Sequence, residues 1–213
     1  MTDTVTLDRL LSWLKLFRDE VTEQASYLTE LDSAIGDADH GSNMTRGMNA
    51  VVEKISASPA RTVDELFKSV GMTLVTSVGG ASGPLYGTFF LRMAAAGGPV
   101  DQLDAAELGA VLRAGLEGVV QRGRAELGDK TMFDAMSPAV DAFEQAVSTG
   151  ASAAEAARLA AAAASDGRES TLPLVARKGR ASYLGERSAG HLDPGATSTA
   201  LLFDALAKAL SEG

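Results

Sequence analysis

The feature that most constrains this chain is a hydrophobic repeat of about 3.6 residues, which returns from one end of the sequence to the other. The first repeat places six apolar side chains on one face of a helix: Leu7, Leu10, Leu11, Leu14, Phe17 and Val21. The same spacing, or a run of strong helix formers, predicts further helices at about 43–57, 62–78, 84–96, 108–119, 134–148, 151–164 and 201–210. No segment alternates apolar and polar residues convincingly enough to predict a strand.

About eight helices without strands predict an all-α fold. The helical runs break clearly at 58–59, 97–99 and 150, where Pro or Gly interrupts them. Short connections of this kind favour antiparallel neighbours. Because the 213 residues contain no long flexible linker, charge block or internal repeat, we expect one domain over 1–213, built as a compact antiparallel helix assembly.

Charge and composition exclude several classes of protein. The net charge of −9 argues against a nucleic-acid partner, because neutralising phosphates requires a basic surface. The absence of Cys excludes disulfides and thiolate metal sites and is compatible with a reducing compartment. No apolar run reaches the roughly 18 residues of a membrane span, and the N-terminus shows no signal-peptide pattern. We therefore expect a cytoplasmic protein that binds neither membrane nor nucleic acid.

Three segments rich in Gly and polar residues interrupt the helices, and the first of them is acidic. Asp32, Asp37 and Asp39 lie close together along the chain, around the glycine Gly36. Carboxylates that converge without a cation would repel one another, and oxygen ligands are those that Mg²⁺ prefers. The alternative is a solvated turn with Asp at helix caps. An EF-hand calcium loop is excluded, because Met48 stands where the twelfth position requires Glu.

A helix expected to start near Asn43 adds a second feature to the acidic segment. Gly41, Ser42 and Asn43 would aim free backbone N–H groups at an anion, and the helix dipole favours negative charge there. A phosphate at this point would lie beside the carboxylates. For His40 three roles stay open: a contact with a nucleotide, a metal ligand, or a cap of the helix.

The second polar segment, 77–87, contains Gly79-Gly80-Ala81-Ser82-Gly83. Its glycines would let a ligand approach the backbone closely, and Ser82 supplies a hydroxyl. A Walker A motif is excluded, because Pro84 stands where Lys is required. A Rossmann fingerprint is excluded as well, because the segment follows a helix and not a strand. The alternative is a tight turn between two helices, with Pro84 at the first position of the second.

The third polar segment, 176–199, contains the densest basic cluster of this acidic chain: Arg177, Lys178 and Arg180. Guanidinium groups match phosphate oxygens, so the cluster either faces a phosphate or forms a solvated basic turn. Asp193-Pro194-Gly195 then precedes another helix start, which is a second potential anion site.

Apolar side chains offer two candidates for contact with a base. We interpret Trp13 and Phe17 as core residues and not as a stacking platform. Met132 and Phe133 follow the loop 128–131 and either belong to the core or cover an adenine ring, which spacing alone does not decide.

Four motifs occur in order along the chain, and together they resemble the nucleotide-binding L subunits of dihydroxyacetone kinases (DhaL). The resemblance extends over essentially the whole chain. The motifs are Asp32-x4-Asp37-x-Asp39-His40-Gly41-x-Asn43, Gly79-Gly80-Ala81-Ser82-Gly83-x-Leu85-Tyr86-Gly87, Gly128-Asp129-Lys130-Thr131-Met132-x-Asp134, and a segment over 182–196 that ends in Asp193-Pro194-Gly195-Ala196.

The resemblance implies an antiparallel eight-helix barrel with ADP or ATP bound at one end. It implies that two Mg²⁺ ions are held by Asp32, Asp37 and Asp39. Arg180, at the phosphates, is the catalytic candidate. Nucleotide contacts are assigned by the resemblance to His40, Gly41, Ser42, Asn43, Ala81, Ser82, Gly123, Met132, Arg180, Asp193, Pro194 and Gly195.

The resemblance also implies the reaction: the chain presents the γ-phosphate of its nucleotide to dihydroxyacetone held on a separate K subunit. Positioning and charge neutralisation by metals and an Arg suffice for such a transfer. In one branch of the family a phosphotransferase-system protein rephosphorylates the bound ADP, whereas in another ATP exchanges, and the sequence leaves both open. It also leaves open a homodimer, another small ketose or polyol as acceptor, and an ADP-loaded regulator that binds a transcription factor.

Overall fold

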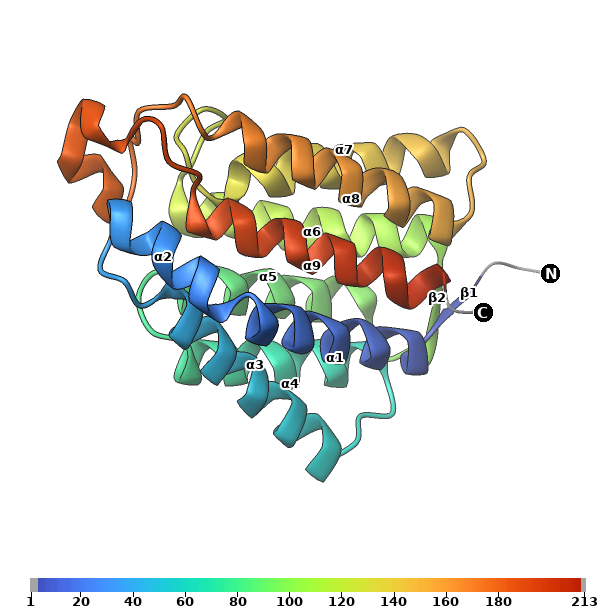
Figure 1. Ribbon diagram of the computed structural model, residues 1–213. Helices are drawn as coiled ribbons and strands as arrows, with labels where there is room; N and C mark the ends of the chain where they lie inside the picture. The colour runs from blue at the N-terminus through green and yellow to red at the C-terminus, as the bar shows by residue number, and fades with distance from the viewer. Residues whose placement is uncertain (1–3, 212–213) are drawn as a thin grey trace.

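In the computed structural model, the described residues 4–211 form nine α-helices, one 3₁₀ helix and a ribbon of two short strands (Figure 1). The 3₁₀ helix η1 spans Arg180–Ser188, and the strands β1 (Thr4–Thr6) and β2 (Gln102–Asp104) pair antiparallel. The α-helices are α1 (Leu7–Glu23), α2 (Ala25–Ile35), α3 (His40–Ala57), α4 (Val63–Ser77), α5 (Ser82–Gly97), α6 (Ala105–Gly123), α7 (Met132–Ser148), α8 (Ala153–Ser170) and α9 (Pro194–Ser211).

Eight of the described α-helices close into a ring. Around the ring, α1 packs against α3, each helix from α3 to α8 packs against the next in the chain, and α9 packs back against α1. The remaining helix, α2, lies outside this order against α3 and, less extensively, against α9. Neighbours in the ring run antiparallel, as short connections favour (Figure 1). The prediction of an all-α, antiparallel eight-helix barrel is confirmed, and the helices predicted from periodicity are those of the ring.

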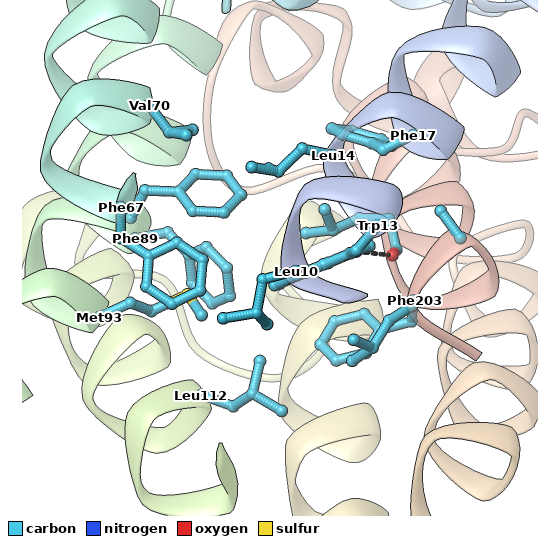
Figure 2. Packing of buried hydrophobic residues seen from close by; sticks show 14 of the residues in the cluster. Leu10, Trp13, Leu14, Phe17, Phe67, Val70, Phe89, Met93, Leu112 and Phe203 are labelled. Carbon is cyan, nitrogen blue, oxygen red and sulfur yellow. Dashed lines mark hydrogen bonds between the residues drawn. The ribbon is translucent and has the colours of Figure 1, made fainter. Parts of the chain in front are cut away.

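Helix α1 contributes Trp13 to an aromatic cluster in the core (Figure 2). Trp13 is fully buried, with ring centroids 6.2 Å from Phe67 and 5.9 Å from Phe90. Its indole Nε1 donates a hydrogen bond of 2.8 Å to the backbone carbonyl of Leu202, which ties α1 to α9. A buried indole N–H requires such an acceptor. Trp13 and Phe17 are therefore core residues, as predicted.

Small residues let neighbouring helices approach closely. A Cβ on Gly71 of α4 would lie 2.8 Å from the carbonyl oxygen of Gly87 on α5, so a larger residue would push the two helices apart. On α8, which packs between α7 and α9, the alanines at helical spacing are fully buried. They are Ala153, Ala156, Ala157, Ala160 and Ala164.

Side chains at the helix starts define where several elements begin. At α6, the carboxylate of Asp104 accepts from the backbone N–H of Glu107, whose own carboxylate accepts from the N–H of Asp104. At α7, Thr131 and Asp134 form a second reciprocal capping box. Such boxes satisfy N–H groups that the helix itself leaves unpaired. The second box anchors the loop before α7.

Two elements differ from the sequence-based expectation. Helix α2 was not predicted, because Gln24 alone separates it from α1 and neither Gly nor Pro marks the break. Its last turn contains residues that were expected in the acidic loop. The ribbon of β1 and β2 was not predicted either. Each strand has three residues, and the two pair across about a hundred positions of sequence, so no local alternation could reveal them.

The antiparallel order brings alternate helix starts to the same end of the barrel. The starts of α3, α5, α7 and α9 gather there with the end of α2 and with η1, while the β ribbon lies at the opposite end (Figure 1). The three polar segments of the sequence therefore meet at one end. None of the described helices combines the length and the apolar character needed to cross a membrane.

Candidate functional site

A cavity of about 550 Å³ opens at the end of the barrel where the polar segments meet. This is within the size range of sites for small molecules. It is lined from the end of α2, the starts of α3, α5, α7 and α9, the last turns of α6, and the region of η1. The predicted site residues that line it are Asp32, Asp37, Asp39, His40, Asn43, Ala81, Ser82, Gly123, Met132, Arg180, Asp193, Pro194 and Gly195.

Two predicted site residues, Gly41 and Ser42, are not among those that line the cavity. Gly41 is buried where α3 crosses α2, and a Cβ there would lie 2.0 Å from the carbonyl oxygen of Ala25. Ser42 is exposed, and its hydroxyl donates to the carbonyl of Asp39 at 2.9 Å. The structure therefore does not place the Ser42 hydroxyl in the cavity.

The three predicted carboxylates converge at one side of the cavity. Asp32 comes from the last turn of α2, and Asp37 and Asp39 come from the loop that follows. One carboxylate oxygen from each lies within 4.8 Å of the others. The loop can fold back so tightly because Gly36 has no Cβ, which would lie 2.0 Å from Oδ1 of Asp32. The cluster can hold a hard cation that takes oxygen ligands.

Asp32 differs from the other two carboxylates because it is buried and has a structural partner. Its Oδ2 accepts from the backbone N–H groups of Asp39 at 2.8 Å and His40 at 3.1 Å. Helix α3 begins at His40, three residues before the predicted start, and the N–H of Asn43 is bonded to the carbonyl of Asp39. The expectation of a free N–H at Asn43 is therefore wrong, because that group already belongs to the helix.

His40 is held between two hydroxyl groups. Its Nε2 lies 2.9 Å from Oγ of Ser198, and its Nδ1 lies 3.2 Å from Oγ of Ser82. Burial lowers the pKa of His40, although the charges of Asp32 and Asp39 act in the opposite direction. A neutral imidazole donates through one nitrogen and accepts through the other, which fits two hydroxyl partners. His40 thus lines the cavity with both ring nitrogens engaged by hydroxyl groups.

Through Ser198, His40 is connected to a buried chain of hydroxyl groups. Oγ of Ser198 lies 2.8 Å from the phenol oxygen of Tyr86, which lies 3.0 Å from Oγ1 of Thr199. Burial raises the pKa of Tyr86 to about 12, so the phenol keeps its proton. Sequence reasoning did not single out Ser198 or the role of Tyr86, because their contacts join α5 and α9 across more than a hundred residues.

The start of α9 is capped by its own acidic residue. Oδ2 of Asp193 accepts from the N–H of Ala196 at 2.7 Å. Burial raises the pKa of Asp193 to about 7; the charges of Asp134 and Asp32 act in the same direction, and the Ala196 N–H and Lys130 oppose them. The predicted anion site at this helix start is thus partly occupied by a protein carboxyl group.

The basic cluster divides between two partners. Arg180 lies 3.0 Å from Asp37, which places its guanidinium beside the carboxylate cluster. Arg177 instead lies 3.8 Å from Asp129, in the loop before α7. Lys178 and Arg180 line the cavity, together with the largely exposed Tyr183. Of the three basic residues, Arg180 is therefore the one placed for a role at the acidic cluster.

Part of the cavity is lined by apolar side chains. Met132 and Phe133, whose role the sequence left open, both line it, with Leu85 and Val119. Gly123 ends α6 beside them, and a Cβ there would lie 3.1 Å from Leu85. The cavity thus has an apolar pocket next to a charged one, which suits a ligand with a flat apolar part and an anionic part.

Comparison with protein families matches residues 34–208 to the DAK2 domain. Among curated proteins, the chain is 47% identical over 204 residues to the PEP-dependent dihydroxyacetone kinase, ADP-binding subunit DhaL, of Escherichia coli, covering 96% of this chain and 97% of that one. It is also 34% identical to an L-erythrulose 1-kinase of Mycolicibacterium smegmatis, covering 95% of this chain and 35% of that longer one.

Among solved structures, the chain is similar to the dihydroxyacetone kinase of C. freundii in complex with AMP-PNP and Mg²⁺. The TM-score is 0.70 at 27% sequence identity, and the match covers 96% of this chain and 34% of that one. The similar region of that larger kinase thus corresponds to nearly the whole of this barrel.

Proposed function

The chain belongs to the DAK2-domain family, and on that premise we propose that it is the nucleotide-binding subunit of a dihydroxyacetone kinase. It binds ADP or ATP with Mg²⁺ in the cavity and transfers a phosphoryl group to dihydroxyacetone held on a separate subunit. The observation that supports this most directly is the cluster of Asp32, Asp37 and Asp39 in a cavity that apolar side chains also line.

The carboxylate cluster fits Mg²⁺ in donor type and spacing. Oxygen ligands around Mg²⁺ lie at about 2.1 Å from the ion, so that ligand atoms are about 3–4 Å apart. The three oxygens, within 4.8 Å of one another, need to close only slightly. We propose that Asp32, Asp37 and Asp39 hold two Mg²⁺ ions. Bound there, the ions would neutralise charge on the nucleotide phosphates.

The remaining wall residues divide by chemistry. We assign the phosphates to the side of His40, Asn43, Ala81 and Ser82, with the backbone N–H groups of Gly41 and Ser42 behind them. The base belongs on the apolar side, against Met132 and Gly123. We assign the sugar and its neighbourhood to the segment Asp193, Pro194 and Gly195, which also lines the cavity and places Gly195 beside Met132. The name of the E. coli relative, an ADP-binding subunit, supports ADP as the ligand.

Arg180 is the catalytic candidate. Its guanidinium lies beside Asp37, and it is long enough to exchange that partner for a phosphate oxygen. Positive charge at the transferring phosphoryl group stabilises the transition state, and positioning supplies most of the remaining rate enhancement. His40 is kept neutral by burial and orients hydroxyls, so it adds no charge of its own.

The acceptor is expected on another polypeptide. Within residues 4–211, we assign the acidic cluster and Arg180 at the cavity to metal and phosphates, and we assign no group of His and Lys side chains there to a small ketone. We propose a dihydroxyacetone-binding K subunit as the partner, and a phosphotransferase-system protein as the donor to bound ADP, which the words "PEP-dependent" in the relative's name support. A cytoplasmic location, a single domain and a homodimer stay predictions.

A second candidate changes only the acceptor. The similarity to an L-erythrulose 1-kinase supports a nucleotide-binding role for a different small ketose, since the acceptor is chosen by the partner. Assays of this chain, the K subunit and their mixture test both proposals, each supplied with Mg²⁺ and with either ATP or phosphoenolpyruvate and the phosphotransferase-system proteins, and with dihydroxyacetone and erythrulose as acceptors. We expect product from the mixture alone. Turnover by this chain without a partner would contradict the two-subunit proposal, and activity on erythrulose alone would favour the second candidate.

A further inference from the structure

Lys130 is a buried cation to which the proposed function gives no task. The residue is 1% exposed, although it lies next to the cavity. Its Nζ donates hydrogen bonds to the backbone carbonyls of Thr171 at 2.8 Å, Leu174 at 3.1 Å and His191. A lysine ammonium has three hydrogens, so these three acceptors satisfy it completely. The ammonium is thus engaged by main chain and is not left free for a ligand.

Two of these carbonyls, those of Thr171 and His191, lie on either side of a segment that approaches the cavity from outside the ring, and the carbonyl of Leu174 lies near the start of that segment. We call residues 172–190 the η1 segment, since they contain η1 and the basic residues before it. Its two ends meet where the N–H of Gly190 donates to the carbonyl of Leu172 at 2.8 Å. Lys130 bonds to main chain on both sides of this neck, at 171 and 174 and at 191. One side chain therefore joins both ends of the segment to the loop before α7.

The same loop makes a second contact with the segment through its backbone. The N–H of Arg177 donates to the carbonyl of Asp129 at 3.1 Å. The loop itself is fixed by the capping box at the start of α7, where Asp134 accepts from Gly128 and Thr131. The η1 segment thus rests on a rigid support, and Lys130 is the side chain that reaches into its neck.

The backbone of Lys130 indicates that the side chain is needed at this point. Its φ is +62°, in the left-handed region that favours Gly or Asn. A lysine in this conformation carries backbone strain that a glycine would not carry. Such a conformation persists where surrounding interactions determine it, and here those are the three carbonyl bonds.

We propose that Lys130 is a positioning residue that holds the η1 segment against the cavity, so that Arg180 stays beside the carboxylate cluster. Within the described part of the chain, the Arg180 guanidinium pairs with the carboxylate of Asp37, and both side chains are substantially exposed. Its placement therefore depends on the segment to which it belongs. The consequence for nucleotide rests on the proposed function, whereas the consequence for the segment does not.

Hydrogen exchange on the unliganded chain tests whether Lys130 holds the η1 segment in place. We compare wild type with Lys130→Met, which keeps length and apolar volume but removes the three donors. The control is Lys208→Met. The ammonium of Lys208 bridges two carboxylates, those of Glu20 and Asp204, near the far end of α9. We expect faster exchange at about 172–190 in Lys130→Met, by tenfold or more. Equal protection of this segment in wild type and Lys130→Met would overturn the proposal.

A double-mutant cycle on ADP affinity tests whether Lys130 positions Arg180. ADP affinity in the presence of Mg²⁺ is measured for Lys130→Met, Arg180→Ala and the double variant. If Lys130 acts through Arg180, each single change weakens binding by about tenfold and the double change weakens it little further. Effects that multiply would show that Lys130 does not act through Arg180. The same cycle with Lys208→Met should show no coupling.

The outcomes separate this inference from the proposed function. A wild-type chain that fails to bind ADP with Mg²⁺ would contradict the proposed function and leave the exchange result to decide the placement of the η1 segment. Wild-type binding with no coupling between Lys130 and Arg180 would contradict the inference alone. If Lys130→Met does not fold, Lys130→Gln, which retains a neutral donor, is measured in the same way and is expected to show the same loss of protection in smaller degree.

Discussion

The acidic cluster predicts that one substitution stabilises the metal-free protein while removing ligand-dependent stabilisation. Asp39→Asn removes one of three carboxylates whose oxygens lie within 4.8 Å of one another. Unlike Asp37, Asp39 has no ion pair with Arg180 to lose, and unlike Asp32 its carboxylate does not hold the start of α3. The change therefore relieves repulsion without breaking a bond that the folded state uses.

The size of the effect follows from the spacing. Two unit charges 4.8 Å apart repel by about 0.9 kcal/mol in bulk water and about 3.5 kcal/mol at an effective dielectric constant of about 20. Solvent screens this cluster, since Asp37 is about one-third exposed, and Arg180 offsets part of the charge. We expect a gain of about 1–2 kcal/mol, which corresponds to a rise in Tm of roughly 2–8 °C for a chain of this length.

Thermal unfolding with a chelator, and then with ADP and excess Mg²⁺, measures both halves of this prediction. Wild type should gain about 2.7 kcal/mol at ligand concentrations a hundred times Kd, and Asp39→Asn should gain far less. Glu53→Gln, on the exposed side of α3, removes the same charge away from the cluster and serves as control. A lower Tm for metal-free Asp39→Asn, or a rise no greater than that of the control, would refute the reasoning.

Two further predictions concern Arg180 and Asp193. Arg180→Ala should slow phosphoryl transfer by about a hundredfold with the partner present. Arg177→Ala should change the rate only slightly, because the Arg177 side chain lies 3.8 Å from Asp129 and away from the acidic cluster. Equal small effects of both changes in a coupled assay would show that the basic cluster is a solvated turn. Because the pKa of Asp193 is raised from 3.8 to about 7, its contribution to the stability of the metal-free protein is complete below about pH 4 and is lost as pH rises through about 7. Urea unfolding of wild type and Asp193→Asn across this range should show a difference that depends on pH, and parallel curves would show that Asp193 ionises normally.

Most of the architecture could be predicted from the sequence because it rests on local periodicity. The stripe on α1 and the alanines of α8 point to their buried faces without any knowledge of neighbours. Helix α2 was missed because its polar last turn contains Asp32 and reads as loop. The contact that closes the ring, from Trp13 to the carbonyl of Leu202, spans 189 residues and has no local signal.

The candidate site divides in the same way. The spacing of Asp37 and Asp39 beside a glycine indicated the acidic cluster, and the structure brings Asp32 to them from a helix. The support behind the site could not be read from the sequence. Ser198 reaches His40 only when α9 returns to α3, and Lys130 reaches its three carbonyls only after the chain has passed through α7 and α8. Such contacts depend on the closed ring and not on neighbours in the chain.

The most direct test of the account is a calorimetric titration of ADP into the purified chain with Mg²⁺, repeated with a chelator and with Asp37→Asn. We predict one nucleotide bound per chain in wild type with Mg²⁺, and an affinity lowered by about a hundredfold or more in the other two experiments, with circular dichroism showing that the helices of the variant remain. Unchanged affinity without Mg²⁺, or in Asp37→Asn, would contradict the claim that the carboxylate cluster holds the nucleotide through magnesium.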